Sequence, residues 1–403
     1  MKALFLGAGA SYECGMPLVW EFTNILRVNV LKRLDTHLFD FRKAPTFRAQ
    51  FEAILSNPNL HYEQMVGELE ALYLERGPHS EIAHSTLLQL VDCVQILLLE
   101  DQMHTAKLFN EKVKDYTGIK GLIDQHPCLH VFSLNHDINF EEICRRHGIR
   151  YRDGFFHGGG ERYSNIARFD TLTKEQMDSG NLNFFVPEEK GVNLIKLHGS
   201  LDIFAVEDKN LYLKCAPSAS EGSGAYLQEI MRAEKHSHEV CAQMQSRTIG
   251  ELNVLDVNGE LQFLRRSLLS GAHKFQGSFD QIAPLAFFKE FKNRMALITE
   301  LDVIGYGFGD FHINSVLSQW LSEENGSINI YDPYRKTVPP EFENNGGKVK
   351  IINGGLTTYF SNYGGPTHSL TSGLRKWAME KAREDLRQRR LGAWKADSGS
   401  AGE

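Results

Sequence analysis

The sequence lacks the paired cysteines of a structural zinc site. Its six cysteines lie far apart, and no Cys-x-x-Cys occurs in the 403 residues. Zinc ribbons and knuckles need two such closely spaced pairs, so the sequence excludes a site of that kind. Disulfides are rare in the cytosol, and we therefore expect six free thiols.

Long apolar runs are also missing. The longest, around residues 95–99, stop well short of the about 18 residues that a membrane span requires. A short strand pattern ending in glycines follows Lys2 directly, where a signal peptide would have an apolar core and a cleavage site. We therefore expect a cytoplasmic protein without membrane contact.

There is no excess of positive charge. Forty-four Lys and Arg face 51 Asp and Glu, a net charge of -7, which argues against a nucleic-acid coat protein. One basic stretch stands out, with seven Lys or Arg and three acidic residues from Arg375 to Arg390. A solvated helix face is its simplest interpretation. The 42% hydrophobic content excludes intrinsic disorder as the main state.

Short apolar segments recur along the chain and predict the fold class. Each has four to seven residues, and most end in Gly, Asn or Asp. Short, fully apolar strands separated by helices are typical of a parallel sheet covered on both faces. The sequence thus predicts an α/β protein with a doubly wound, Rossmann-like parallel sheet. The predicted strands lie at residues 2–6, 129–134, 192–197, 301–305, 328–331 and 349–352.

The domain organisation follows from the spacing of these strands. Apolar residues three or four apart predict that 18–125 is a helical insertion or subdomain, because it is far longer than one crossover needs. We expect the Rossmann-like core to comprise 1–17 and 126–360, with an irregular insertion at 205–285. For 366–403 we expect a basic helix and a disordered tail after Gly392.

A glycine-rich turn follows the first predicted strand. Its sequence is Gly7-Ala8-Gly9-Ala10-Ser11, with Pro17 further on. Such glycines let backbone N–H groups approach a pyrophosphate, and a helix N-terminus favours the negative charge. Glycine-rich turns also serve as plain packing devices, so this motif alone leaves both interpretations open.

Four further motifs stand at predicted strand ends, where ligands bind in open α/β sheets. Asn135 and Asp137 could orient a sugar hydroxyl or a water, or form an Asx turn. His198 could be a general base or a hydrogen-bonded structural residue. The motifs are Ser-Leu-Asn-His-Asp at 133–137, Lys-Leu-His-Gly-Ser at 196–200, Gly-Tyr-Gly-Phe-Gly-Asp at 305–310 and Asn-Ile-Tyr-Asp-Pro at 329–333.

Taken in order, these motifs resemble the sirtuin family, particularly the bacterial sirtuin-like NAD hydrolases of antiphage defence. The likeness is scattered from Lys2 to about Asp332, and residues 18–125 and 205–285 contribute nothing to it. The resemblance implies NAD as the substrate. Asn135 would position the attacking water, His198 would act as the catalytic base, and Asp137 would support the nicotinamide or the same network.

The resemblance also implies which residues border the rest of the dinucleotide. Those expected at the phosphates are Gly7, Ala8, Gly9 and Ser11. Those expected at the ribose and diphosphate are Gly305, Gly307 and Asp310. Asp332 would lie at the adenosine end.

The sequence departs from the deacylating sirtuins in three ways. Only Cys215 and Cys241 fall in the interval that holds their four-cysteine zinc module, so we expect neither that module nor any other metal site. The segment that pairs with an acyl-lysine peptide is not recognisable. The acidic-arginine stretch expected after Gly-x-Pro is replaced by Leu-Val-Trp-Glu-Phe at 18–22. These losses favour water as the acceptor.

The first hypothesis is therefore an NAD+ glycohydrolase that yields ADP-ribose and nicotinamide and acts in antiphage defence by NAD depletion. Its activity would be gated by a homo-oligomeric ring and by a HerA-type hexameric ATPase, with DNA contacted only through that complex. Residues 18–125 and 374–386 could form the interfaces, or could simply pack within the chain. The alternatives are a protein deacylase or ADP-ribosyltransferase, and a nucleotide-binding scaffold subunit with little activity of its own.

Overall fold

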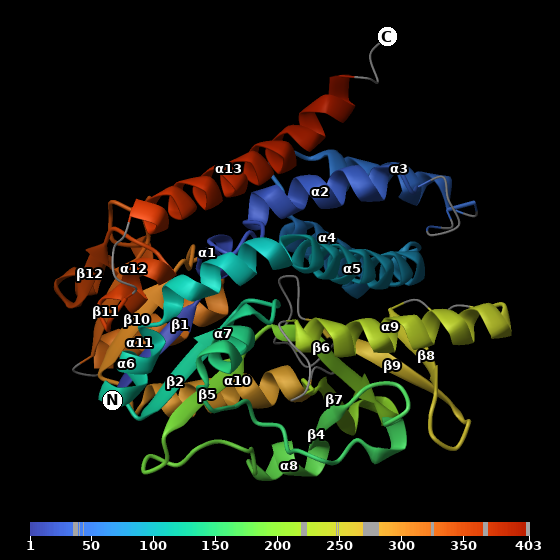
Figure 1. The fold of residues 1–403 in the computed structure, drawn as a ribbon. Coiled ribbons are helices and arrows are strands. Elements are labelled where there is room, and N and C mark those ends of the chain that lie inside the picture. The colour runs from blue at the N-terminus through green and yellow to red at the C-terminus, as the bar shows by residue number, and fades with distance from the viewer. Residues whose placement is uncertain are drawn as a thin grey trace.

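The computed structural model describes residues 1–399 except 35–38, 40, 43, 219–223, 247, 249, 269–281, 324–325 and 366–369. Two sheets and a layer of helices make up the fold (Figure 1). The predicted α/β class is confirmed, with one antiparallel sheet beyond the prediction.

The parallel sheet has seven strands in the order β12-β11-β10-β1-β2-β5-β3, and each strand pairs in parallel with its neighbours. The central strand β1 pairs with β2 on one side and β10 on the other, so the strand order reverses between β1 and β10. In such sheets the point of reversal opens a crevice at the carboxyl ends of the strands. The strands are β1 (Lys2–Leu6), β2 (Cys128–Ser133), β3 (Tyr151–Arg152), β5 (Gly191–Lys196), β10 (Glu300–Ile304), β11 (Ser327–Tyr331) and β12 (Val349–Ile352).

Helices cover both faces of this sheet, which explains why its central strand β1 carries apolar residues on both faces. Ala3 and Phe5 of β1 pack in the core formed with α10 and α11, whereas Leu4 and Leu6 pack in the core formed with α6, α7 and α12. This alternation is the two-residue period of a strand buried on both sides. The helices are α6 (Ile119–Gln125), α7 (Asn139–His147), α10 (Ile282–Met295), α11 (Phe311–Glu323) and α12 (Leu356–Ser361).

The segment 18–125 is mostly helical. Its helix α5 is long and apolar enough to cross a membrane by length and composition, but 67% of its most apolar window is buried inside the protein. A core helix of a soluble protein has these properties, and the apolar side chains of α5 lie in a core shared with the neighbouring helices. Besides α6, the helices of this segment are α2 (Val19–Leu31), α3 (Pro45–Ser56), α4 (Tyr62–Leu74) and α5 (Ser80–Lys112).

The expectation of an irregular insertion at 205–285 is wrong for the part of that segment that the structure describes. Three strands and α9 (Ala225–Met244) lie in it, and they complete a five-stranded antiparallel sheet of order β4-β7-β6-β9-β8 (Figure 1). This sheet shares its core with the helices of 18–125. Charged residues within β9, such as the buried Arg266, hide its apolar pattern. The strands are β4 (Phe169–Thr173), β6 (Gly199–Val206), β7 (Leu211–Cys215), β8 (Glu251–Leu255) and β9 (Leu261–Leu268); α8 (Lys174–Ser179) follows β4.

The predicted C-terminal basic helix is α13 (Leu370–Gly399), which lies along α2 (Figure 1). Contrary to the predicted disorder after Gly392, the helix continues to Gly399. Residues 400–403 of the predicted tail lie outside the described residues.

Candidate functional site

A cleft of about 790 Å³ opens at the carboxyl ends of the parallel strands. Its volume is in the range of small-molecule sites, roughly 300–1,000 Å³. It lies at the edge where the strand order reverses, between the loops that follow β1 and β10. All the site residues predicted from the sequence line this cleft: Gly7, Ala8, Gly9, Ser11, Asn135, Asp137, His198, Gly305, Gly307, Asp310 and Asp332.

Three of the glycines are explained by close packing of two loops. The N–H of Gly9 donates to the carbonyl of Gly305 at 2.8 Å. A Cβ on Gly7 would lie 2.5 Å from the Cα of Tyr306, and one on Gly9 would lie 2.7 Å from the Cα of Gly305. Gly305 itself has a φ of +63°, where glycine is favoured. Gly307 has no such neighbour, because nothing lies within 4 Å of the place its Cβ would take.

The helix expected to direct its N-terminus at a phosphate is short. The loop leads into α1 (Ala8–Tyr12), which has only five residues, and the next helix starts at Val19. Such a helix carries a small macrodipole, so backbone N–H groups and side chains have to provide most of any anion binding. The glycine-rich turn thus leads first into the short α1, and the longer helix α2 begins only after Pro17.

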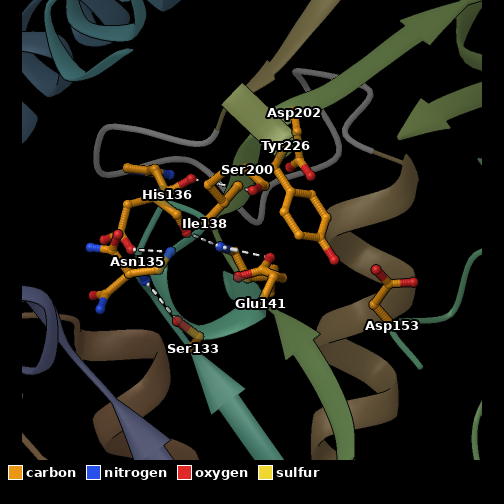
Figure 2. A network of polar contacts seen from close by, with 12 residues as sticks. Ser133, Asn135, His136, Ile138, Glu141, Asp153, Ser200, Asp202 and Tyr226 are labelled. Carbon is orange, nitrogen blue, oxygen red and sulfur yellow. Dashed lines mark hydrogen bonds and ion pairs between the residues drawn. The ribbon is translucent and has the colours of Figure 1, made fainter. Parts of the chain in front are cut away.

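The loop after β2 places Asn135 beside the glycine-rich turn. The Asn135 amide Nδ2 donates to the Ser11 hydroxyl at 3.0 Å, and the Asn135 backbone N–H donates to the Ser133 hydroxyl at 3.1 Å. Figure 2 shows Ser133 and Asn135 at the end of β2. A side chain tied to two neighbouring loops holds one orientation toward the cleft, as the positioning of a reactant requires.

Asp137 forms the Asx turn considered for it and also faces the cleft. Its Oδ1 accepts the N–H of Asn139 at 3.0 Å, which is the Asx turn that starts α7. The carboxyl also lines the cleft. Burial raises the pKa of Asp137, and the nearby Lys196 charge and the Asn139 N–H act against that rise.

His198 lies between β5 and β6 and is held by Asp310. Its Nε2 is 2.9 Å from Asp310 Oδ2, and both side chains are buried. The other oxygen of Asp310 accepts the N–H groups of His312 and Ile313 at the start of α11. A carboxylate fixed in this way orients an imidazole and stabilises its protonated form. Asp310 therefore contacts the predicted base, in addition to bordering the cleft where the resemblance implies the ribose and diphosphate.

Asp332 follows β11 at another part of the cleft wall. Its Oδ1 accepts the backbone N–H groups of Tyr334 and Arg335 at 2.8 and 3.2 Å. Its Oδ2 lies 3.7 Å from the Arg335 guanidinium. The Asp332 carboxylate is thus held by the turn that follows β11.

Buried ion pairs beneath the cleft join the two sheets (Figure 2). Lys196 donates to the backbone carbonyl of Asp137 and lies 3.4 Å from Glu141 of α7. Lys214 of β7 lies 3.5 Å from the same Glu141 oxygen and 2.8 Å from Asp202 of β6. Lys196 therefore ties the loop that carries Asn135 and Asp137 to a buried charge network that spans both sheets.

Sequence reasoning missed the part of the cleft formed by helices. These residues come from α2, the start of α4, the turn after β11 and α13, and only the basic stretch of α13 gave any signal in the sequence. They include Trp20, which is 45% exposed, and its edge-to-face neighbour His61. The further members are Tyr62, Glu63, Tyr334 and Arg383.

Across the described residues, no group of three or more His, Cys, Asp or Glu is placed to hold a metal ion. No protein-family model matches the chain, and no curated protein matches it.

Proposed function

We propose that the protein hydrolyses NAD+ to ADP-ribose and nicotinamide in this cleft. The main support is the convergence of Asn135 and the His198–Asp310 pair on one cleft, next to the two glycine-rich loops. The sirtuin-like motifs are far apart in the sequence, yet their residues meet at the edge where open α/β sheets bind ligands.

The chemistry suits these residue types. The nicotinamide ring carries its positive charge before the glycosidic bond breaks, so it leaves as a neutral molecule and needs no strong general acid. The reaction needs an oriented water and stabilisation of a ribose that develops oxocarbenium character. In this proposal Asn135 orients the water, and His198, held by Asp310, takes its proton.

By the same resemblance, the biological role is antiphage defence through NAD depletion, gated by self-assembly and by a HerA-type hexameric ATPase. A constitutive NAD hydrolase would harm its host, so control by assembly is reasonable. The outer face of α13 exposes Leu374 and Trp377, at 71% and 62%, as an oligomer or partner interface would require. DNA would be contacted only through that complex.

A scaffold subunit is the second candidate. Packing alone accounts for Gly7, Gly9 and Gly305, so the glycines would be kept even without catalysis. A nucleotide would then bind without being cleaved.

The test is nicotinamide release from NAD+, measured by chromatography with and without a HerA-type ATPase and DNA. Asn135→Ala and His198→Ala should each reduce the rate by about 10²-fold or more, the contribution of a positioned base or orienting group. His238→Ala is the matched control, because His238 is exposed on α9 away from the cleft. NAD+ binding without release under any condition would favour the scaffold.

A further inference from the structure

The charge lining the cleft is uneven. Among the described residues that line it, Arg383 is the one Lys or Arg, and it comes from α13 near the C-terminus. Five carboxyl groups line the cleft as well, so an anionic ligand would find few cations there. They belong to Glu13, Glu63, Asp137, Asp310 and Asp332.

These carboxyl groups are largely matched within the protein. Asp310 pairs with His198, and Glu63 accepts the Tyr62 hydroxyl at 3.2 Å. The other three each lie near a cation that stands behind the cleft wall. The pairs are Glu13 with Lys112 at 3.3 Å, Asp332 with Arg335 at 3.7 Å, and Asp137 with Lys196.

Arg383 is not matched in this way. Its guanidinium lies over the ring of Tyr12, 5.0 Å from the ring centroid, and its Nε is buried without a hydrogen-bond partner among the described residues. Tyr12 is the last residue of α1, which begins in the glycine-rich turn. A guanidinium has five N–H donors, and a buried donor without an acceptor destabilises a protein, so the group is suited to an oxygen-rich ligand.

Ion pairs on both sides of Arg383 fix the helix that carries it. Toward the C-terminus, Arg390 contacts Glu21 of α2 at 3.4 Å and Asp101 of α5 at 3.1 Å. Toward the N-terminus, Arg375 pairs with the buried Asp115. Arg383 is therefore held at the cleft by the docking of α13.

We infer that Arg383 binds the diphosphate of the nucleotide held in the cleft. Naming that ligand as a dinucleotide rests on the proposed function, whereas the need for phosphate oxygens rests on Arg383 itself. A planar guanidinium forms paired N–H···O bonds with phosphate that a backbone loop alone does not supply. The substrate class is thus a nucleoside diphosphate ester, and its binding site is completed by Arg383, a residue outside the sheet.

The experiment measures the affinity of purified full-length protein for ADP-ribose, ADP and adenosine by calorimetry. Arg383→Gln removes the charge and keeps most of the side-chain length. It should weaken ADP-ribose and ADP binding by roughly tenfold or more, as expected for a charged hydrogen bond, and leave adenosine binding unchanged. Arg383→Lys should recover only part of the loss, because it keeps the charge without the paired geometry.

Arg389→Gln is the matched control, since it makes the same charge change at an exposed site on the same helix. Unchanged adenosine affinity in Arg383→Gln also reports an intact cleft. Equal ADP-ribose affinity in wild type and Arg383→Gln would overturn the inference, as would a wild type that binds neither ADP-ribose nor ADP. Nicotinamide release is measured separately: weakened binding without release would uphold the role of Arg383 and reject hydrolysis.

Discussion

Replacing Lys214 by Met should destabilise the protein strongly at neutral pH. The Lys214 ammonium lies 2.8 Å from Asp202, 3.5 Å from Glu141 and 3.6 Å from Asp153, and its side chain is only 2% exposed. Methionine keeps the apolar stem and removes the charge. Removing one partner of a buried ion pair typically costs about 3–5 kcal/mol, because the remaining charges stay buried without compensation.

The pH dependence distinguishes this explanation from a packing defect. Burial opposes ionisation of Asp202, but the Lys214 and Lys196 charges outweigh burial and lower its pKa. Burial raises the pKa of Asp153 to about 6, even though Lys214 acts against that rise. Without Lys214 the folded pKa of Asp153 should rise further above its unfolded value, and the folded pKa of Asp202 should rise from below its unfolded value to above it.

The sign follows from these shifts. In the variant, carboxyl groups whose pKa is higher in the folded than in the unfolded state lose stability as pH rises from about 4, and recover it as pH falls. In the wild type, the stability that Asp202 gains from its lowered pKa is retained until the pH falls below about 4. The difference between the two proteins should therefore shrink from pH 7 to pH 5.

Urea unfolding at pH 5, 6 and 7 measures this difference. Lys235→Met is the control, since Lys235 is 79% exposed on α9. Adding Asp202→Asn to Lys214→Met should restore part of the loss by removing one orphaned charge. A loss below about 1 kcal/mol, or one that does not change with pH, would refute the electrostatic explanation.

Three further predictions concern the cleft and the helix α13 beside it. Gly305→Ala should lower the free energy of unfolding, measured by thermal melts, by about 2 kcal/mol or more. The φ of Gly305 is +63°, and the new Cβ would lie 2.4 Å from backbone atoms. The control Gly307→Ala should leave the free energy of unfolding nearly unchanged, because nothing lies within 4 Å of the place its Cβ would take. Asp310→Asn should lower kcat for nicotinamide release more than it changes KM. It should also move the acidic limb of the pH–rate profile to lower pH, because the imidazolium of His198 loses its carboxylate partner; an unchanged profile would speak against a positioning role. Glu21→Gln should make α13 easier to remove by limited proteolysis, since Arg387 and Arg390 both lie within 4 Å of that carboxylate; equal cleavage rates would show that other contacts hold the helix.

The sequence alone predicted those cleft residues whose position follows from the geometry of a parallel sheet. Carboxyl ends of neighbouring parallel strands share one edge, so polar residues just after β1, β2, β5, β10 and β11 had to converge. Ser11 and Asn135 illustrate this, since 124 positions separate two side chains that are hydrogen-bonded.

The rest depended on tertiary contacts without a local signature. Arg383 is one of several cations on a helix that looks solvated in sequence. Ion pairs such as that of Arg390 with Glu21, 369 positions away, hold this helix so that Arg383 lines the cleft. The antiparallel sheet was hidden for a similar reason. Arg266 in β9 interrupts an apolar pattern but is buried against Asp92 and Glu234.

The central position of β1 has a consequence for how the protein is made. Lys2 and its partner Glu300 in β10 are 298 positions apart, so one edge of the first strand stays unpaired during most of translation. At about 5–20 residues per second this interval lasts roughly 15–60 s. An apolar strand with an open edge is prone to aggregate for that time. Since Arg383 of α13 also lines the cleft, a nascent chain has no complete cleft until the ribosome has passed residue 383.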